Sequence, residues 1–149
     1  MKYLAIITQT ATGFSGTVHD LPVMATAKTL EALEQDLSEG LALWLDEATP
    51  PTKIAQKLSD LPADIQAAYE GQSPTELLIE PAPMNPVSLE VERAIEASGL
   101  SYRELARRMG TGHASLSRLA NPFYWGHSLP MLRRLAEELG LHIELKLTA

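Results

Sequence analysis

SYRELARRMGTGHASLSRLA, residues 101–120, has the pattern of two short helices joined by a tight turn. Ser101 and Glu104 are spaced as a capping box, in which each side chain binds a free amide at a helix start. Gly110 stands where the first helix would end in the left-handed conformation that glycine adopts readily. One face of each predicted helix is apolar, and the side chains expected to pack the two together as a helix-turn-helix are Leu105, Ala106, Met109, Leu116 and Leu119.

The other face of the second predicted helix is small and polar and contains one arginine, Arg118. A helix with such a face can enter the major groove of DNA. We therefore expect this segment to bind DNA. With neighbouring positions of the motif included, the predicted DNA-binding residues are Tyr102, Arg107, Arg108, Gly112, His113, Ala114, Ser117, Arg118 and Asn121.

Several of these residues can also be explained without DNA binding. An ordinary helical hairpin would have a similar apolar pattern, and His113 is equally explained as a solvated surface side chain. Arg107 and Arg108 are expected to contact phosphate, although arginines are common on any helix surface. The spacing resembles the helix-turn-helix of lambda-repressor-like regulators, and the run MGTGH, residues 109–113, is close to the turn of that family. This resemblance favours DNA binding.

Charge is distributed unevenly along the chain. The net charge is −7 overall. Residues 1–86 hold four lysines and 12 acidic residues, a net charge of −8, whereas residues 87–149 hold eight basic and seven acidic residues. Within 101–136, six arginines are opposed only by Glu104, which gives a local charge of +5 suited to phosphates. The acidic half would repel DNA and suits a basic partner, so the split predicts two domains with different partners.

Composition excludes several classes of protein. The 149 residues suffice for one ordinary domain or two small ones. There is no cysteine, and the four histidines lack ligand spacing, so we expect neither a disulfide nor a metal site, and no cofactor. No apolar run is long enough to span a membrane, and the N-terminus is unlike a secretion signal. We expect a soluble cytoplasmic protein without a membrane partner.

The predicted fold class is α+β, with a small mixed sheet packed against a helix in residues 1–82. Thr29 is expected to cap the main helix, which Pro50 and Pro51 stop. A proline-rich linker, residues 83–86, follows. The predicted strands are Lys2–Thr8 (buried on both faces), Gly13–Val18, Val23–Ala27 and Thr75–Glu80; the predicted helices are residues 30–47, Lys53–Leu58 and Pro62–Glu70.

Residues 87–149 are predicted to be an all-α bundle that ends in a strand. Ser88 is expected to cap the first helix and Ser128 the last, which has Pro130 in its first turn and a stripe of Leu129, Leu132, Leu135 and Leu139. The tail alternates strictly, and an isolated strand has unpaired edges, so we expect it to pair with a second copy of the chain. The residues predicted to mediate this dimerisation are Leu141, Ile143, Leu145 and Leu147.

The N-terminal half resembles the HicB family of antitoxins. The matching segments are GFSG at residues 13–16, DLP at 20–22 and TLEA at 29–32, in a β-β-β-α-β order. The resemblance covers residues 2–47 and 75–80. The sequence departs from the family at Val23, where a glycine is usual, and in the length of residues 49–74.

This resemblance implies an N-terminal partial ribonuclease-H-like domain followed by a DNA-binding domain. It also implies two partners besides a second copy: a HicA-like toxin, which is a small basic RNA-cleaving protein, and operator DNA. The chain would then block the toxin and repress the operon that encodes both. The alternative is a free-standing repressor whose N-terminal half senses a ligand or only dimerises.

No catalytic residue is expected. A ribonuclease-H-type site needs carboxylates that hold two metal ions, and the first strand contains no Asp or Glu. Asp20, Glu31, Glu34 and Asp36 are better explained as turn and helix-surface residues. Ser15, His19 and Asp20 are close in sequence, but neighbours along a chain seldom form a catalytic triad.

Overall fold

The computed structural model describes all residues, 1–149, and the chain divides into two compact units. The first unit is Met1–Pro83 and the second is Met84–Ala149. Each has its own hydrophobic core. Strands occur only in the first unit, and the α+β class predicted for the chain is confirmed.

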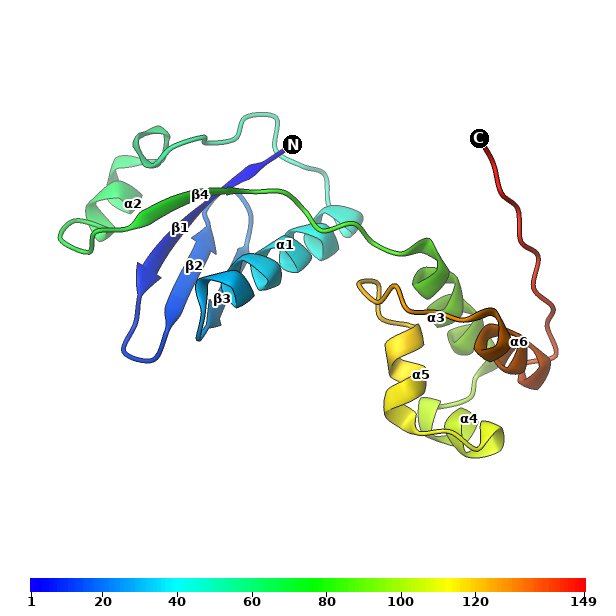
Figure 1. Cartoon of the computed structure of the whole chain (residues 1–149). Coiled ribbons are helices and arrows are strands. Elements are labelled where there is room, and N and C mark those ends of the chain that lie inside the picture. The colour runs from blue at the N-terminus through cyan, green and yellow to red at the C-terminus, as the bar shows by residue number, and fades with distance from the viewer. The chain divides into compact units, whose positions relative to one another are not determined.

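The first unit is built on a four-stranded sheet of β1 (Tyr3–Gln9), β2 (Phe14–Val18), β3 (Val23–Ala27) and β4 (Thr75–Ile79) (Figure 1). The strand order is β3-β2-β1-β4, and each neighbouring pair is antiparallel. The prediction of a mixed sheet is therefore wrong.

The direction of β4 follows from the path of residues 48–74. Helix α1 (Leu30–Glu47) begins just after β3, near the end of the sheet where β1 finishes, and returns along the sheet. A strand entering directly after α1 would run parallel to β1. Residues 48–74 instead carry the chain back, so that Thr75 pairs with Ile7 and Ile79 with Tyr3. Because residues 48–74 are longer than a simple connection, β4 runs opposite to the direction that a short connection would give it.

One face of the sheet is covered by α1. The side chain of Thr29 accepts a hydrogen bond from the amide of Ala32, which confirms the predicted cap. The apolar stripe Leu33, Leu37 and Leu41 is fully buried against the sheet. A Cβ at Gly16 would lie 2.8 Å from Cδ1 of Leu37, so a larger residue there would force this buried side chain to move.

The opposite face is covered by residues 55–69, which include the 3₁₀ turn η1 (Leu58–Asp60) and α2 (Ala63–Ala68). Leu4 and Ile6 pack there, so β1 is buried on both faces as predicted.

The helix predicted at Lys53–Leu58 does not form. Two amides of this segment instead donate to carboxylates from elsewhere in the first unit: Ala55 to Asp20 at 2.7 Å and Leu58 to Glu76. His19 is also bonded to Tyr69 of the covering segment, and burial lowers the pKa of its imidazole. Long-range hydrogen bonds have replaced the local helix.

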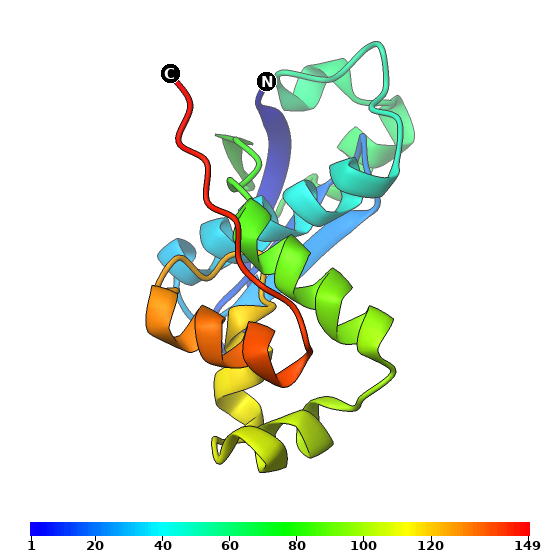
Figure 2. The same cartoon turned by 90° about the vertical axis from the view of Figure 1, so that its right-hand side faces the viewer.

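The second unit contains α3 (Pro86–Ser98), α4 (Tyr102–Met109), α5 (His113–Leu119) and α6 (Leu129–Glu138) (Figure 2). Their shared core includes Ile95, Leu105, Leu116 and Leu135, all at most 4% exposed.

The start of α3 differs from the prediction. Asn85 caps this helix, its side chain accepting from the amide of Val87, and Pro86 occupies the first turn. The dipeptide Asn-Pro is a signal that would have placed the start here. Ser88, predicted as the cap, lies inside the helix, fully buried, with its hydroxyl 3.2 Å from Nε2 of His127.

Asn85 also joins α3 to the loop between α5 and α6. Its side-chain amide donates to the carbonyl of Tyr124 at 2.9 Å and lies 3.2 Å from Nδ1 of His127. Nε2 of His127 is 2.7 Å from the carbonyl of Leu119 and must donate to it, which leaves Nδ1 as the acceptor for Asn85. This buried polar network fixes the loop that follows α5.

Helix α6 begins as predicted, with Ser128 accepting from the amide of Met131 and Pro130 in the first turn. Leu135 is buried, and Leu132 and Leu139 pack partly against the core. Leu129 is 50% exposed, so its assignment to the buried stripe is wrong. It is the first residue of the helix and lies beside the tail instead of over the core.

The tail after Gly140 is extended but is not a strand in the single chain (Figures 1 and 2). No strand exists in the second unit to accept its amides. Leu145 and Leu147 are 70% and 90% exposed. Pairing with a second copy stays a prediction.

No helix in the structure has both the length and the apolar character needed to cross a membrane.

Candidate nucleic-acid interface

Helices α4 and α5 are held at a fixed angle by a short turn and a common core. The Ser101 hydroxyl accepts from the amide of Glu104 at 3.1 Å, which starts α4. Gly110 ends it with φ +66°, and the amide of Thr111 returns to the carbonyl of Ala106 at 3.0 Å. Leu105 and Leu116 are completely buried between the helices. The free face of α5 is thereby presented on a rigid support.

The Glu104 carboxylate makes a different contact from the one the sequence predicts. It does not complete the capping box; it accepts from Arg107 at 2.6 and 3.0 Å and from Arg108 at 3.2 Å. These two hydrogen-bonded arginines lower the pKa of the Glu104 carboxyl to about 2. Glu104 is therefore ionised at any pH near neutrality.

Arg107 and Arg108 are exposed, with 72% and 43% of their side chains accessible. A phosphate that approached them would compete with a carboxylate already bonded to both. Exposed ion pairs are weak, so a phosphate could displace the carboxylate. The pairing would lower the affinity of these arginines for phosphate without abolishing it. Glu104 thus moderates the charge of this end of α4.

The outer face of α5 is exposed at His113, Ala114 and Arg118, and half-buried at Ser117. Gly112 caps the helix without a side chain. The guanidinium carbon of Arg118 lies 5.9 Å from the centre of the Tyr124 ring, a cation–π distance that restricts the arginine while leaving it at the surface. No carboxylate pairs with Arg118.

An aromatic residue, Tyr102, and a polar residue, Asn121, lie beside the outer face of α5. The Tyr102 ring is 6.1 Å from the ring of His113, centre to centre. Burial, followed by the charges of Glu92 and Glu96, raises the pKa of the Tyr102 hydroxyl, so it stays a neutral donor. Asn121 is exposed and its side-chain oxygen accepts from the amide of Phe123 at 2.9 Å, which closes the turn after α5.

Arg134 has a structural contact that the charge count did not predict. Its guanidinium donates to the carbonyl of Met109, at the end of α4, from 25 residues along the chain. No local spacing indicates such a bond. The arginines of residues 101–136 that form neither an ion pair nor a side-chain hydrogen bond are Arg103, Arg118 and Arg133.

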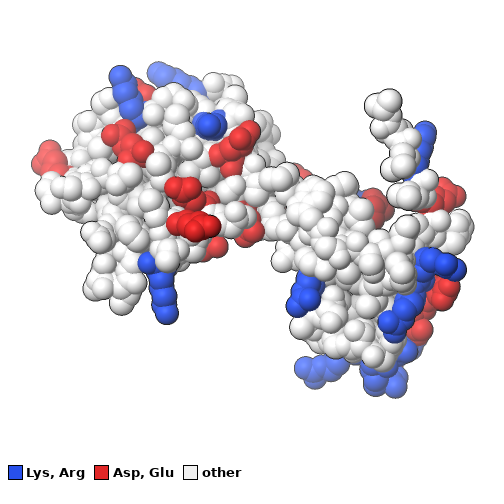
Figure 3. Space-filling model, in the orientation of Figure 1, with Lys and Arg blue, Asp and Glu red and all other residues white.

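Charged groups in Figure 3 follow the division of the chain. Lys and Arg side chains lie at the bottom and sides of the second unit, with some Asp and Glu side chains at its right, and the first unit shows a group of Asp and Glu side chains together with separate Lys side chains. In the first unit no three metal-ligating side chains lie together, and Asp20 is occupied by the amide of Ala55. The geometry presented by the second unit is that of an exposed helix with arginines around it.

No protein-family model matches the sequence, and a comparison with proteins of described function finds no match. Function is therefore inferred from the residues and their geometry.

We expect Glu104→Gln to strengthen binding to DNA of any sequence, because it releases two arginines for phosphate. Affinity should rise by roughly threefold at low salt, since exposed ion pairs of this kind are weak. The slope of log affinity against log salt should steepen by about one to two units, because each new phosphate contact adds ~0.9. Fluorescence anisotropy with a labelled random duplex measures both.

Glu90→Gln is the matched control, because Glu90 forms a similar exposed pair with Arg93 on α3, at 2.6 Å. It removes the same charge outside α4 and α5. Equal gains from the two substitutions would show that net charge alone, and not the release of Arg107 and Arg108, changes the affinity.

Proposed function

We propose that this chain is an antitoxin of the HicB type that represses its own operon. In this proposal the second unit binds operator DNA through a helix-turn-helix formed by α4 and α5, and the first unit binds and blocks a small basic RNA-cleaving toxin. The observation that carries it is the exposed face of α5, with the unpaired Arg118, in a chain whose other unit has a net charge of −8.

The DNA-binding half rests on how α5 is presented. Its outer residues are small or polar from Gly112 to Ser117, which permits close approach to base edges. Arg118 is the residue best placed to read guanine, since arginine is its commonest specific partner. Arg107 and Arg108, at the end of α4, would contact phosphates and position the helix.

Arg118→Ala is expected to weaken binding to the operator by about 1–3 kcal/mol, the usual cost of a lost arginine–guanine contact. Affinity for unrelated DNA should change little. Gel shifts with the DNA upstream of the gene and with a scrambled duplex measure the two. Arg93→Ala removes the same charge from α3 and serves as the control; if Arg118→Ala binds the operator like wild type, Arg118 does not read bases.

A dimer is proposed because a palindromic operator needs two copies of α5 about one DNA turn apart. The tail supplies an apolar row of alternate side chains that is largely exposed in the single chain. Leu141, Ile143, Leu145 and Leu147 range from 37% to 90% exposed. Pairing two tails would satisfy the amides that face the partner strand and would bring the two apolar rows together on one face.

The double substitution Leu145→Lys with Leu147→Lys is expected to give monomers and to remove cooperative binding to the operator. His142→Lys, on the alternate face of the same tail, should leave the dimer intact. Sedimentation of the three proteins measures the association. A dimer that survives the double substitution would place the interface outside the tail.

The toxin-binding half is proposed from charge and from element order. The first unit has a β-β-β-α-β order, as in the partial ribonuclease-H-like domain of the family it resembles, with an additional covering segment before β4. Its acidic surface would speed encounter with a basic protein, and apolar contacts would prolong the complex. Covering the toxin's active site is the mechanism that requires no chemistry from this chain.

Co-expression with any small basic protein that the adjacent reading frame encodes tests this half. That protein should arrest growth alone, and the full chain should relieve the arrest and copurify with it. Arg118→Ala should rescue growth equally well, since DNA reading is not needed to block the toxin. Unrelieved arrest, or a harmless neighbour, would favour a free-standing repressor.

A further inference from the structure

Strand β4 is one edge of the sheet in the first unit, and no strand pairs with its outer side. The outer side of an edge strand presents unpaired backbone donors and acceptors that can bind another extended chain. Just after β4, the chain is tied to α1: the Ser38 hydroxyl donates to the carbonyl of Glu80 at 2.6 Å, and the amide of Ala82 donates to the carbonyl of Ser38. The edge is therefore held at a fixed distance from the helix.

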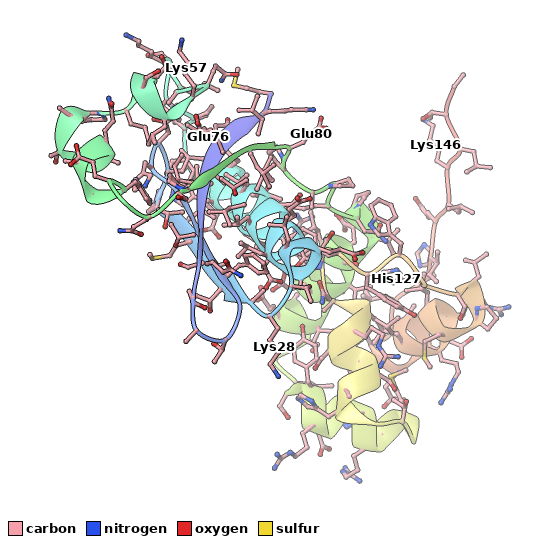
Figure 4. All side chains as sticks on the ribbon, turned by 60° about the vertical axis from the view of Figure 1, so that its left-hand side comes forward. Lys28, Lys57, Glu76, Glu80, His127 and Lys146 are labelled. Carbon is pink, nitrogen blue, oxygen red and sulfur yellow. The ribbon has the colours of Figure 1, made fainter.

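A hollow of about 350 Å³ lies between this edge and α1. Its lining residues come from one face of α1 and from β4 and the residue after it: Glu31, Glu34, Gln35, Ser38 and Leu77–Glu80. Figure 4 labels Glu76, which lies in β4, and Glu80, which follows it. The hollow thus combines an open strand edge with side chains of a neighbouring helix.

The side chains on the two sides of this edge differ in character. The hollow contains three carboxylates, Glu31 and Glu34 from α1 and Glu80 just after β4, and no lysine or arginine. On the other face of the sheet, Leu78 is 44% exposed. Leu77 and Ile79 pack with the α1 core, so Leu78 points to the opposite face by the alternation of a strand.

We propose that the β4 edge binds an extended basic segment of the partner protein as a fifth strand of the sheet. Alternate side chains of the added strand would face α1, where lysine or arginine meets Glu31 and Glu34. The intervening side chains would face the side of Leu78, where an apolar residue can pack against it; Glu76, on the same face, already accepts a hydrogen bond from the amide of Leu58. The edge is thereby selective for a strand that alternates basic and apolar residues.

Charge argues against a second copy of this chain as the occupant. Two β4 edges that paired with each other would bring the carboxylates of both hollows together, and like charges across paired strands are destabilising. The inference rests on the proposed function for the identity of the partner, a basic toxin, but the chemistry of the edge can be tested without it.

The test uses the full chain, labelled with ¹⁵N, and the short peptide acetyl-KVKVKVK-amide as the probe. Titration at low salt should shift the amide signals of residues 75–80 and 31–38 in a saturable manner. The charge-reversed peptide acetyl-EVEVEVE-amide should not bind. A lysine peptide with alternate backbone amides methylated keeps its charge but cannot pair as a strand, and it should bind at least severalfold more weakly.

The double substitution Glu31→Gln with Glu34→Gln should weaken the lysine peptide about tenfold, because each exposed ion pair adds a modest free energy. Asp46→Asn with Glu47→Gln removes the same charge from the end of α1, outside the hollow, and should have little effect. Thermal unfolding of both variants verifies that they are folded.

Shifts spread over acidic residues elsewhere, shifts confined to β3, or no saturable binding would overturn the proposal. So would preferential binding of acetyl-LHIELKL-amide, which carries the tail sequence of residues 141–147 and would identify the tail as the occupant. A chain that binds the lysine peptide at β4 but not the neighbouring gene's product would disprove the toxin partner while the edge specificity stands.

Discussion

Burial of β1 on both of its faces is the constraint on which the first unit depends. Five consecutive residues, Tyr3–Ile7, are at most 3% exposed, so the strand needs cover on both sides. Helix α1 supplies one layer and residues 55–69 supply the other. The second layer is formed by the chain between α1 and β4, so it also determines at which end of the sheet β4 begins. The outer side of β4 stays unpaired.

In the second unit, the short helices α4 and α5 are held in place without a large hydrophobic core. Helices of eight and seven residues are too short to be stable alone, so their angle depends on tertiary contacts. Leu105 and Leu116 provide the apolar contact, and Arg134 caps the end of α4 from α6. The network of Asn85, Ser88 and His127 holds the loop after α5. The outer face of α5 therefore takes no part in the packing of the unit.

Electrostatics connects the two proposed activities. An acidic unit in the same chain would oppose DNA, and a basic partner bound to it would offset that repulsion. Glu104 acts locally in the same direction, since it holds Arg107 and Arg108 in exposed pairs. In the proposed repressor this pairing would limit sequence-independent attraction, so a larger share of DNA binding would depend on contacts with base edges. Discrimination between operator and other DNA would benefit.

Local chemistry explains which features the sequence by itself determined. Thr29, Ser101 and Ser128 start helices, and glycines at 99, 110 and 140 have positive φ at helix ends, because caps and left-handed turns involve only neighbouring residues. The apolar periodicity of α1 and α4 and the charge difference between the halves are likewise properties of the chain alone. The Asn-Pro start of α3 was also available in the sequence, but Ser88 competed with it as a plausible cap.

Tertiary structure alone decided the direction of β4, the loss of the helix at Lys53–Leu58 and the contacts of Arg134. Each depends on a partner distant in sequence: Ile7 for Thr75, Asp20 for the amide of Ala55, and Met109 for Arg134. The pairing of Glu104 with two arginines is local, yet a capping box and an ion pair both use the carboxylate of Glu104, so spacing could not choose between them. A hydrogen-bonding group is bound by whichever partner the completed fold brings near it, and sequence spacing describes only the nearby candidates.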